Sequence, residues 1–252
     1  KVDGVYIANG NNNTAQVSVD SGVAAVQKLK GDLENLVIAV VGANGSVGSI
    51  CSEMASEYAS RLVLVGSEKA DSVERLEEKL ERVKEVSKTR YGRTPEIELS
   101  TDLESALKDV DLTYTATDSY RQTVFPEMVK KGSVIVDIAR PHDTGKGNGF
   151  VERGVLAIDG GLQYYNGDGE WKINFGSMGT PRGYFLACAA EPLILAMAKD
   201  RNRNLIQTNI EDALLLRKYS DEFGFQIDKG VFRYHYNPID HKKMEAIKRN
   251  AG

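Results

Sequence analysis

The chain of 252 residues is long enough to bury a substantial core, and it fits one large domain or one domain with an appendage. Its hydrophobic content of 41% and charged content of 27% are those of a globular protein, which excludes disordered, collagen-like and membrane-embedded chains. A formal net charge of -4 gives no overall attraction for nucleic acid or for an anionic membrane.

The cysteine content and the first residues bear on where such a chain works. Cys51 and Cys188 have neither metal-ligand spacing nor the density of a disulfide scaffold, so we expect a reducing, cytoplasmic compartment and no metal site. No signal peptide is recognisable. The chain opens at Lys1 rather than at a methionine and reads like the middle of a protein, which is typical of a fragment.

Short apolar runs rich in valine and isoleucine, typical of strands buried on both faces, recur as far as Asp159. They cover residues 37–41, 62–65, 97–99, 112–116, 134–138 and 155–158. Helices are predicted between them at residues 47–59, 71–90, 102–108 and 122–131. The alternation predicts an α/β fold, a doubly wound parallel sheet of the Rossmann, NAD(P)-binding kind, followed by C-terminal helices.

The character of the sequence changes beyond Asp159. The glycine-rich stretch 159–183 is too irregular for regular structure, apart from a predicted short strand at 171–174, and is typical of a functional loop. Residues 184–200 are strongly apolar and predict a buried helix with a kink at Pro192, because proline removes a backbone donor.

The C-terminal part is more polar. A second amphipathic helix follows, with Asn209 as its cap and Gly224 as its stop. The basic tail, residues 225–252, is either an ordered surface extension or a frayed end. We therefore expect three parts: a leading segment at 1–35 that ends an upstream substrate region, a dinucleotide-binding Rossmann domain at 36–198, and a C-terminal helical segment and tail at 199–252.

A glycine turn lies between the first predicted strand and the first helix after it. Gly42, Gly45 and Gly48 form GxxGxxG, and these glycines allow a tight turn and a close approach to a pyrophosphate at a helix N-terminus. The alternative is a turn that serves only strand and helix packing. The other residues of this turn expected to bind the cofactor are Asn44, Ser46 and Val47.

The end of the second strand normally selects between the two nicotinamide cofactors. Ser67 and Lys69 favour the 2'-phosphate of NADPH, whereas Glu68 favours the free ribose hydroxyl of NADH. NADPH is therefore the expected cofactor with NADH possible, and the alternative is that these charges form only a solvated turn.

The ends of the fourth and fifth predicted strands also meet at the cofactor edge of such a sheet. The fourth strand supplies Ala116, Thr117 and Asp118 as expected cofactor contacts. The fifth supplies His142, which is either a proton donor or a surface or structural histidine. Its polar neighbours in the sequence are Asp137, Arg140 and Asp143.

Cys188 allows two interpretations. Its neighbours are alanine, leucine and phenylalanine, so it could simply pack in the core, as free cysteines often do. A dinucleotide turn in a chain with an intracellular cysteine also suggests thioester chemistry, in which a thiolate takes an acyl group and a hydride reduces it.

Several segments, taken in order, resemble the long-chain acyl-[acyl-carrier-protein] reductases of cyanobacterial alkane biosynthesis. They are "ANGNNNTAQVSVDSGVAAV", "IAVVGANGSVGSIC", "VIVDIARPHDTG", "EWKI", "YFLACAAEPLILAM" and "DALLLRKYSDEFGF". The resemblance implies reduction of a fatty acyl thioester to a fatty aldehyde with NADPH. It places the acylated nucleophile at Cys188 and the cofactor glycines at Gly42, Gly45 and Gly48. The family differs in having a substrate-handling region upstream and an arginine where this chain has Ser67.

The resemblance implies a two-stage reaction. Cys188 attacks the acyl thioester of an acyl carrier protein or coenzyme A, and NAD(P)H then reduces the acyl-enzyme to an aldehyde. Because the thiolate is the reactive form of a cysteine, we expect a cation nearby. Lys172 and Arg182 are the candidates, and both could instead be surface residues.

An acidic carrier protein would dock on a basic face. One candidate cluster is Lys199, Arg201 and Arg203, and the other is Lys242, Lys243, Lys248 and Arg249. Either cluster could instead serve only solubility.

Two other functions stay open at the level of sequence. One is a shikimate-dehydrogenase-like NAD(P)-dependent alcohol dehydrogenase, in which hydride passes directly to a ketone and no cysteine acts. The other is a Rossmann module that binds a nucleotide without turnover.

Overall fold

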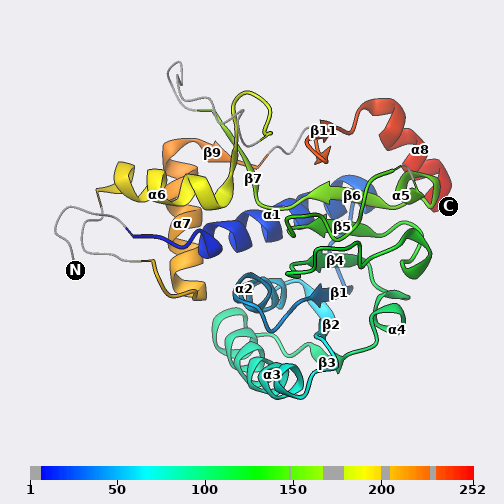
Figure 1. The fold of residues 1–252 in the computed structure, drawn as a ribbon, viewed down its shortest axis with the longest axis horizontal. Coiled ribbons are helices and arrows are strands. Elements are labelled where there is room, and N and C mark those ends of the chain that lie inside the picture. The colour runs from blue at the N-terminus through cyan, green and yellow to red at the C-terminus, as the bar shows by residue number, and fades with distance from the viewer. Residues whose placement is uncertain (1–6, 148, 167–178, 200–204, 228–230) are drawn as a thin grey trace.

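The computed structural model describes residues 7–147, 149–166, 179–199, 205–227 and 231–252 (Figure 1). Its centre is a six-stranded parallel sheet in the order β3-β2-β1-β4-β5-β6. The strands are β1 (Leu36–Val41), β2 (Ala59–Val65), β3 (Glu96–Ser100), β4 (Leu112–Thr115), β5 (Val134–Asp137) and β6 (Leu156–Asp159). The predicted doubly wound parallel sheet is confirmed.

Strand order reverses direction at β1, which pairs with β2 on one side and with β4 on the other. In open α/β sheets, the carboxyl ends of the strands at such a switch point form the ligand-binding crevice. All four residues of β4 and all four of β5 are buried, as expected for strands covered on both faces.

Helices cover both faces of the sheet. One face packs against α1 (Asn11–Lys30), α2 (Ser46–Ala55) and α3 (Ala70–Tyr91), and its core includes Ile38, Leu64 and Tyr114. The other face packs against α4 (Leu103–Leu107), the short 3-10 helix η1 (Pro126–Met128) and α5 (Gly149–Glu152).

The chain beyond β6 adds a smaller antiparallel sheet in the order β8-β7-β9. Its strands are β7 (Leu162–Tyr165), β8 (Tyr184–Leu186) and β9 (Phe225–Gln226), and they share a separate core cluster with α6 (Ala187–Ala198) and α7 (Ile210–Phe223). In Figure 1, α6 and α7 lie beside the first half of α1. A two-stranded ribbon of β10 (Arg233–Tyr234) and β11 (Asn237–Pro238) then leads to α8 (His241–Ala251), which packs on α5.

The predicted helix at residues 122–131 is wrong. The backbone N–H groups of Thr123 and Val124 both donate to the carbonyl of Asp143, which holds this segment as a loop. Pro126 then opens only the short η1, because a proline is tolerated at the start of a helix but not within it. The apolar spacing here serves the core beneath the loop, where Val124 and Val129 are buried.

Other predicted boundaries shift. The helix predicted at 47–59 ends at Ala55, because β2 already begins at Ala59. The helix predicted at 184–200 is preceded by the strand β8, and Pro192 lies inside α6. The strand predicted at 171–174 lies outside the described residues. Neither α1 nor the smaller sheet was expected.

The basic tail is an ordered surface extension and not a frayed end, because Met244 and Ile247 of α8 are buried in the main core. This core is the cluster that includes Ile38, Leu64 and Tyr114. The division of the chain at residues 35 and 198 stays a prediction. In the described part of the chain, no helix has both the length and the apolar character needed to cross a membrane.

Candidate functional site

The glycine turn joins β1 to α2 and leaves no room for side chains. Gly42 has φ 81°, and a Cβ on it would lie 2.6 Å from the carbonyl oxygen of Ala116. A Cβ on Gly48 would lie 2.2 Å from the carbonyl oxygen of Gly42. The turn therefore needs glycine at both positions, and it packs against the end of β4, the strand that pairs with β1.

The N-terminus of α2 is open. The turn closes on itself through the N–H of Gly45, which donates to the carbonyl of Gly42 at 3.0 Å. By contrast, the N–H groups of Ser46, Val47 and Gly48 make no hydrogen bond to any residue that the structure describes. Gly45 and Ser46 are exposed. Outward-facing donors at the positive end of a helix form an anion-binding site.

The loop after β2 is tied to the turn through Ser72. Its hydroxyl accepts a hydrogen bond from the side-chain amide of Asn44 at 2.8 Å and from the backbone N–H of Ser67 at 3.1 Å. Ser67, Glu68 and Lys69 are all exposed beside the turn. Ser72 thus holds the loop that carries Ser67, Glu68 and Lys69 beside the glycine turn, and their contact with a cofactor stays a prediction.

The segment after β4 is anchored by a buried carboxylate. Asp143 accepts hydrogen bonds from the N–H of Thr117 at 3.3 Å and from the hydroxyl of Thr123 at 3.0 Å. Burial raises the pKa of Asp143, and the hydrogen bonds from these threonines oppose that rise. Asp118 is exposed and Ala116 lies against Gly42. The predicted cofactor residues therefore share one edge of the sheet.

The loop after β5 is held from the strand that precedes it. Asp137, which is fully buried, accepts the N–H of Thr144 at 2.9 Å and the N–H of Asp143 at 3.3 Å. Arg140 lies exposed in this loop, with Nη2 4.0 Å from Oδ1 of Asp159. Asp137 therefore has a structural role in shaping the edge of the sheet.

His142 is half-buried, and Nε2 lies 2.9 Å from Oδ1 of Asp159 at the end of β6. Asp159 also accepts the backbone N–H groups of His235 at 3.0 Å and Tyr236 at 2.7 Å. The rings of His142 and His235 lie 4.0 Å apart, and burial lowers the pKa of His235. A carboxylate therefore orients His142, which fits either open interpretation of this residue. Asp159 and His235 were not predicted from the sequence, although Asp159 ends its strand as Asp137 does.

Cys188 is the second residue of α6 and is exposed. It is therefore not a core cysteine, unlike Cys51, which is fully buried. The N–H of Ala187 donates to the carbonyl of Gly161 at 2.8 Å, which fixes the start of α6 to the loop after β6. Gly10, immediately before α1, lies directly against Cys188.

Cys188 and the glycine turn lie at the same edge of the sheet. The far end of α1 is at the amino edge, where Lys30 contacts Asp111 at 2.6 Å just before β4 begins. The helix therefore starts at the carboxyl edge, and Gly10 at that start contacts Cys188. The glycine turn follows the carboxyl end of β1 at this same edge.

Of the two expected cations, Lys172 lies outside the described residues. Arg182 is exposed in the turn before β8, and β8 lies between it and Cys188. Of the basic clusters, Arg201 and Arg203 are also outside the described residues, whereas Lys199 is exposed at the end of α6. The second cluster, Lys242, Lys243, Lys248 and Arg249, is exposed on α8, on the opposite side of the molecule from α6 in Figure 1.

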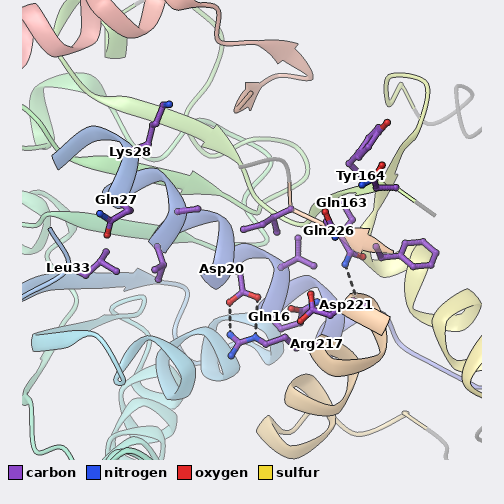
Figure 2. Close-up of a pocket in the computed structure, with 17 residues that line it drawn as sticks. Gln16, Asp20, Gln27, Lys28, Leu33, Gln163, Tyr164, Arg217, Asp221 and Gln226 are labelled. Carbon is purple, nitrogen blue, oxygen red and sulfur yellow. Dashed lines mark hydrogen bonds and ion pairs between the residues drawn. The ribbon is translucent and has the colours of Figure 1, made fainter. Parts of the chain in front are cut away.

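A groove of about 880 Å³ runs along α1 between α7, β7 and β9 (Figure 2). One wall carries the ion pair of Asp20 and Arg217, at 2.6 Å, and burial raises the pKa of Asp20 to about 6. Gln163 in this groove accepts a hydrogen bond from Asn13, whose amide also donates to the carbonyl of Ala187. The groove is thus linked to the start of α6, although Cys188 is not among the residues that line it.

No protein-family model matches the chain. Among curated proteins, the chain is similar to the long-chain acyl-[acyl-carrier-protein] reductase of Synechococcus elongatus, with 26% identity over 189 residues that cover 74% of this chain. The match covers 50% of that relative, so this chain spans about half the length of the protein that it resembles. The finding supports in part the family resemblance expected from the motifs, and does not by itself place the chain in that family.

Three solved structures are distantly similar to the chain. One of the dipicolinate synthase subunits from Bacillus halodurans is 12% identical, with a TM-score of 0.46, over 77% of this chain and 57% of that one. Shikimate 5-dehydrogenase from Listeria monocytogenes, in complex with shikimate and NAD, is 14% identical, with a TM-score of 0.41, over 57% of this chain and 52% of that one. The nucleotide-binding domain of glutamyl-tRNA reductase from Thermoplasma volcanium is 19% identical, with a TM-score of 0.37, over 56% and 84%.

Proposed function

We propose that the chain is the cofactor-binding and catalytic part of an NAD(P)H-dependent reductase that converts an acyl thioester to an aldehyde. The observation that carries the proposal is the exposed Cys188 at the start of α6, on the same edge of the sheet as the open glycine turn. A nucleophile and a dinucleotide turn at one edge are what a thioester reduction requires.

The cofactor would lie across this edge. The free N–H groups of Ser46, Val47 and Gly48 fit its pyrophosphate, because glycine at positions 42 and 48 lets the backbone approach closely. Ala116, Thr117 and Asp118 would line its nicotinamide half. At the ribose, Ser67 and Lys69 favour NADPH, and Glu68 keeps NADH possible.

Cys188 would do the covalent chemistry. Its thiolate attacks the thioester carbonyl, forms a new thioester to the enzyme and releases the carrier as a thiol, which takes up one proton. When bound, NAD(P)H supplies the hydride that reduces the acyl group. The carbon–sulfur bond to Cys188 then breaks, which releases the aldehyde and restores the thiolate. Lys172 and Arg182 stay proposals as the cations that favour this thiolate.

The similarity to a long-chain acyl-[acyl-carrier-protein] reductase supports an acyl carrier protein as the donor, with acyl-CoA as the alternative. Because this chain spans half of that relative, a further region that handles the substrate belongs to the proposal. The reaction needs Cys188 as a free thiol, which fits a reducing, cytoplasmic compartment. An acidic carrier would find Lys199 nearer to Cys188 than the basic cluster of α8.

A second candidate is a direct reduction of a ketone, in the manner of a shikimate dehydrogenase. The orientation of His142 by Asp159 favours it, because a histidine held by a carboxylate is a suitable proton donor. In that reaction no cysteine acts.

One comparison of variants separates the two candidates. Cys188→Ala should lower aldehyde formation from an acyl thioester and NADPH at least about a hundredfold, because the covalent step is lost. Cys51→Ala is the matched control, since Cys51 is buried against Ala15 and far from solvent. Gas chromatography of the aldehyde measures both variants. Unchanged turnover in Cys188→Ala would exclude the covalent mechanism.

A further inference from the structure

The first turns of α6 and α1 hold each other in place. Glu191, one turn beyond Cys188, is fully buried. Its Oε1 accepts the N–H of Gly10 at 3.1 Å, and its Oε2 accepts the N–H of Asn13 at 2.9 Å. In return the side-chain amide of Asn13 donates to the carbonyl of Ala187 at 2.8 Å. A carboxylate from α6 therefore caps α1, and an amide from α1 fixes the residue before Cys188.

Gly10 brings the two backbones into direct contact. Its φ is 79°, and a Cβ built on it would lie 2.5 Å from the Cβ of Cys188 and 2.7 Å from its Cα. Real atoms do not approach so closely, so any side chain at position 10 would displace the backbone of Cys188. Cys188 therefore occupies the volume that a side chain at position 10 would need.

The same helix reaches the helix that begins at the glycine turn. Ala15 of α1 packs in the main core with Cys51 of α2, whose Sγ lies 3.9 Å from the Ala15 carbonyl oxygen. One rigid helix of 20 residues therefore touches both α6, which carries Cys188, and α2, which begins at the open turn. The separation between the thiol and the turn depends on where α1 sits.

We infer that Gly10 and Glu191 are positioning residues for Cys188, which hold its thiol at a fixed place relative to the cofactor turn. The inference rests on the proposed function. Acyl transfer needs the sulfur about 3 Å from the carbonyl carbon, and a misplacement of about 1 Å can cost about a hundredfold in rate. Neither residue touches the substrate in this account.

The test measures acylation of Cys188 by the decanoyl thioester of N-acetylcysteamine without cofactor, followed by intact mass spectrometry. Gly10→Ala should lower the acylation rate constant at least about tenfold, because the new Cβ moves Cys188. Gly31→Ala is the matched control, since Gly31 ends α1 with φ 76° and has no atom within 4 Å of the added Cβ. The acylation rate constant of Gly31→Ala should stay within about twofold of that of the unaltered protein.

A second variant guards against misfolding. Glu191→Gln keeps one acceptor for the N–H groups of α1 and loses the other, so it should lower acylation about fivefold. NADPH affinity, and alkylation of the exposed thiol by iodoacetamide, should both stay within about threefold of the unaltered protein. A merely structural role for Glu191 would lower all of these together with the melting temperature.

The outcomes separate this inference from the proposed function. Equal acylation rates in the unaltered protein, Gly10→Ala, Gly31→Ala and Glu191→Gln would overturn the positioning role and leave the reductase proposal intact. If the unaltered protein forms no acyl adduct on Cys188, the proposed function is wrong and the positioning role falls with it.

Discussion

Two of the helices that begin at the carboxyl edge of the sheet, α1 and α2, use their N-termini differently. At α2, the N–H groups of Ser46, Val47 and Gly48 have no partner among the residues that the structure describes. At α1, the N–H groups of Gly10 and Asn13 are bonded to the carboxylate of Glu191. Both ends carry the same positive helix dipole, so the dipole alone does not define a ligand site.

The neighbouring structure decides the role of each end. The turn before α2 lies open at the edge of the sheet, which leaves its donors for a phosphate. The end of α1 is covered by α6, which supplies its own anion and gains an anchor for Cys188. In the proposed function, the N-terminus of α2 binds the cofactor, and the N-terminus of α1 holds Cys188 in place.

Removing the carboxylate should have the largest effect. Glu191→Ala leaves the buried N–H groups of Gly10 and Asn13 without acceptors and should lower the free energy of unfolding by about 3 kcal/mol. Urea denaturation measures this, with Glu245→Ala, an exposed glutamate of α8, as the control that should cost under about 0.5 kcal/mol. An equal effect of both variants would contradict the capping role of Glu191.

The second largest effect is expected from blocking the open N-terminus of α2. Gly48→Ala puts a Cβ 2.2 Å from the carbonyl oxygen of Gly42 and should weaken NADPH binding about a hundredfold, or about 2.7 kcal/mol. Fluorescence titration with NADPH measures it. Gly92→Ala is the control, because its Cβ meets no atom within 4 Å, so it should leave the dissociation constant unchanged. Wild-type affinity in Gly48→Ala would contradict the assignment of the turn.

The two helices also carry carboxylates further along, the half-buried Asp20 on α1 and the buried Glu53 on α2, and their raised pKa values predict the pH dependence of stability. Burial raises the pKa of Glu53 on α2 from 4.5 to about 7, although Arg82 lies 3.8 Å away. A raised pKa means that the folded chain binds the proton more tightly than the unfolded chain. The stabilisation that the protonated Glu53 gives to the folded chain is complete below pH 4.5 and is lost as pH rises through about 7.

Glu53→Gln should therefore remove about 2 kcal/mol of the fall in unfolding free energy between pH 4.5 and pH 7. Asp20→Asn on α1 should reduce the fall in unfolding free energy over a lower pH range, because burial raises the pKa of Asp20 from 3.8 to only about 6. Urea midpoints across this pH range measure both. If the unfolding free energy fell more steeply with pH in Glu53→Gln than in the unaltered protein, the raised pKa of Glu53 would be contradicted.

Local patterns explain what could be predicted from the sequence. The buried strands read as continuous valine and isoleucine runs, and the glycine turn stands between a strand and a helix, so the sheet and the position of the turn were both predictable. The segment at 122–131 has helical apolar spacing, but the carbonyl of Asp143, distant in sequence, holds it as a loop. Periodicity alone could not reveal that contact.

The candidate site, like the fold, was predictable only in part. Cys188 was found through its resemblance to a family motif, but its exposure became clear only from the fold. The contact between Glu191 and Gly10 joins residues separated by 181 positions, and no local signal marks it. The polar start of α1 lacks an apolar stripe because its side chains bond to α6 and to the segment before α7. Long-range polar contacts of this kind need coordinates.

The most direct measurement is intact mass spectrometry of the protein after incubation with an acyl thioester and no cofactor, followed by peptide mapping and addition of NADPH. The account predicts an acyl adduct on Cys188 that disappears with release of an aldehyde. An unmodified Cys188 in a protein that still binds NADPH would contradict the covalent mechanism and leave a nucleotide-binding module with other chemistry.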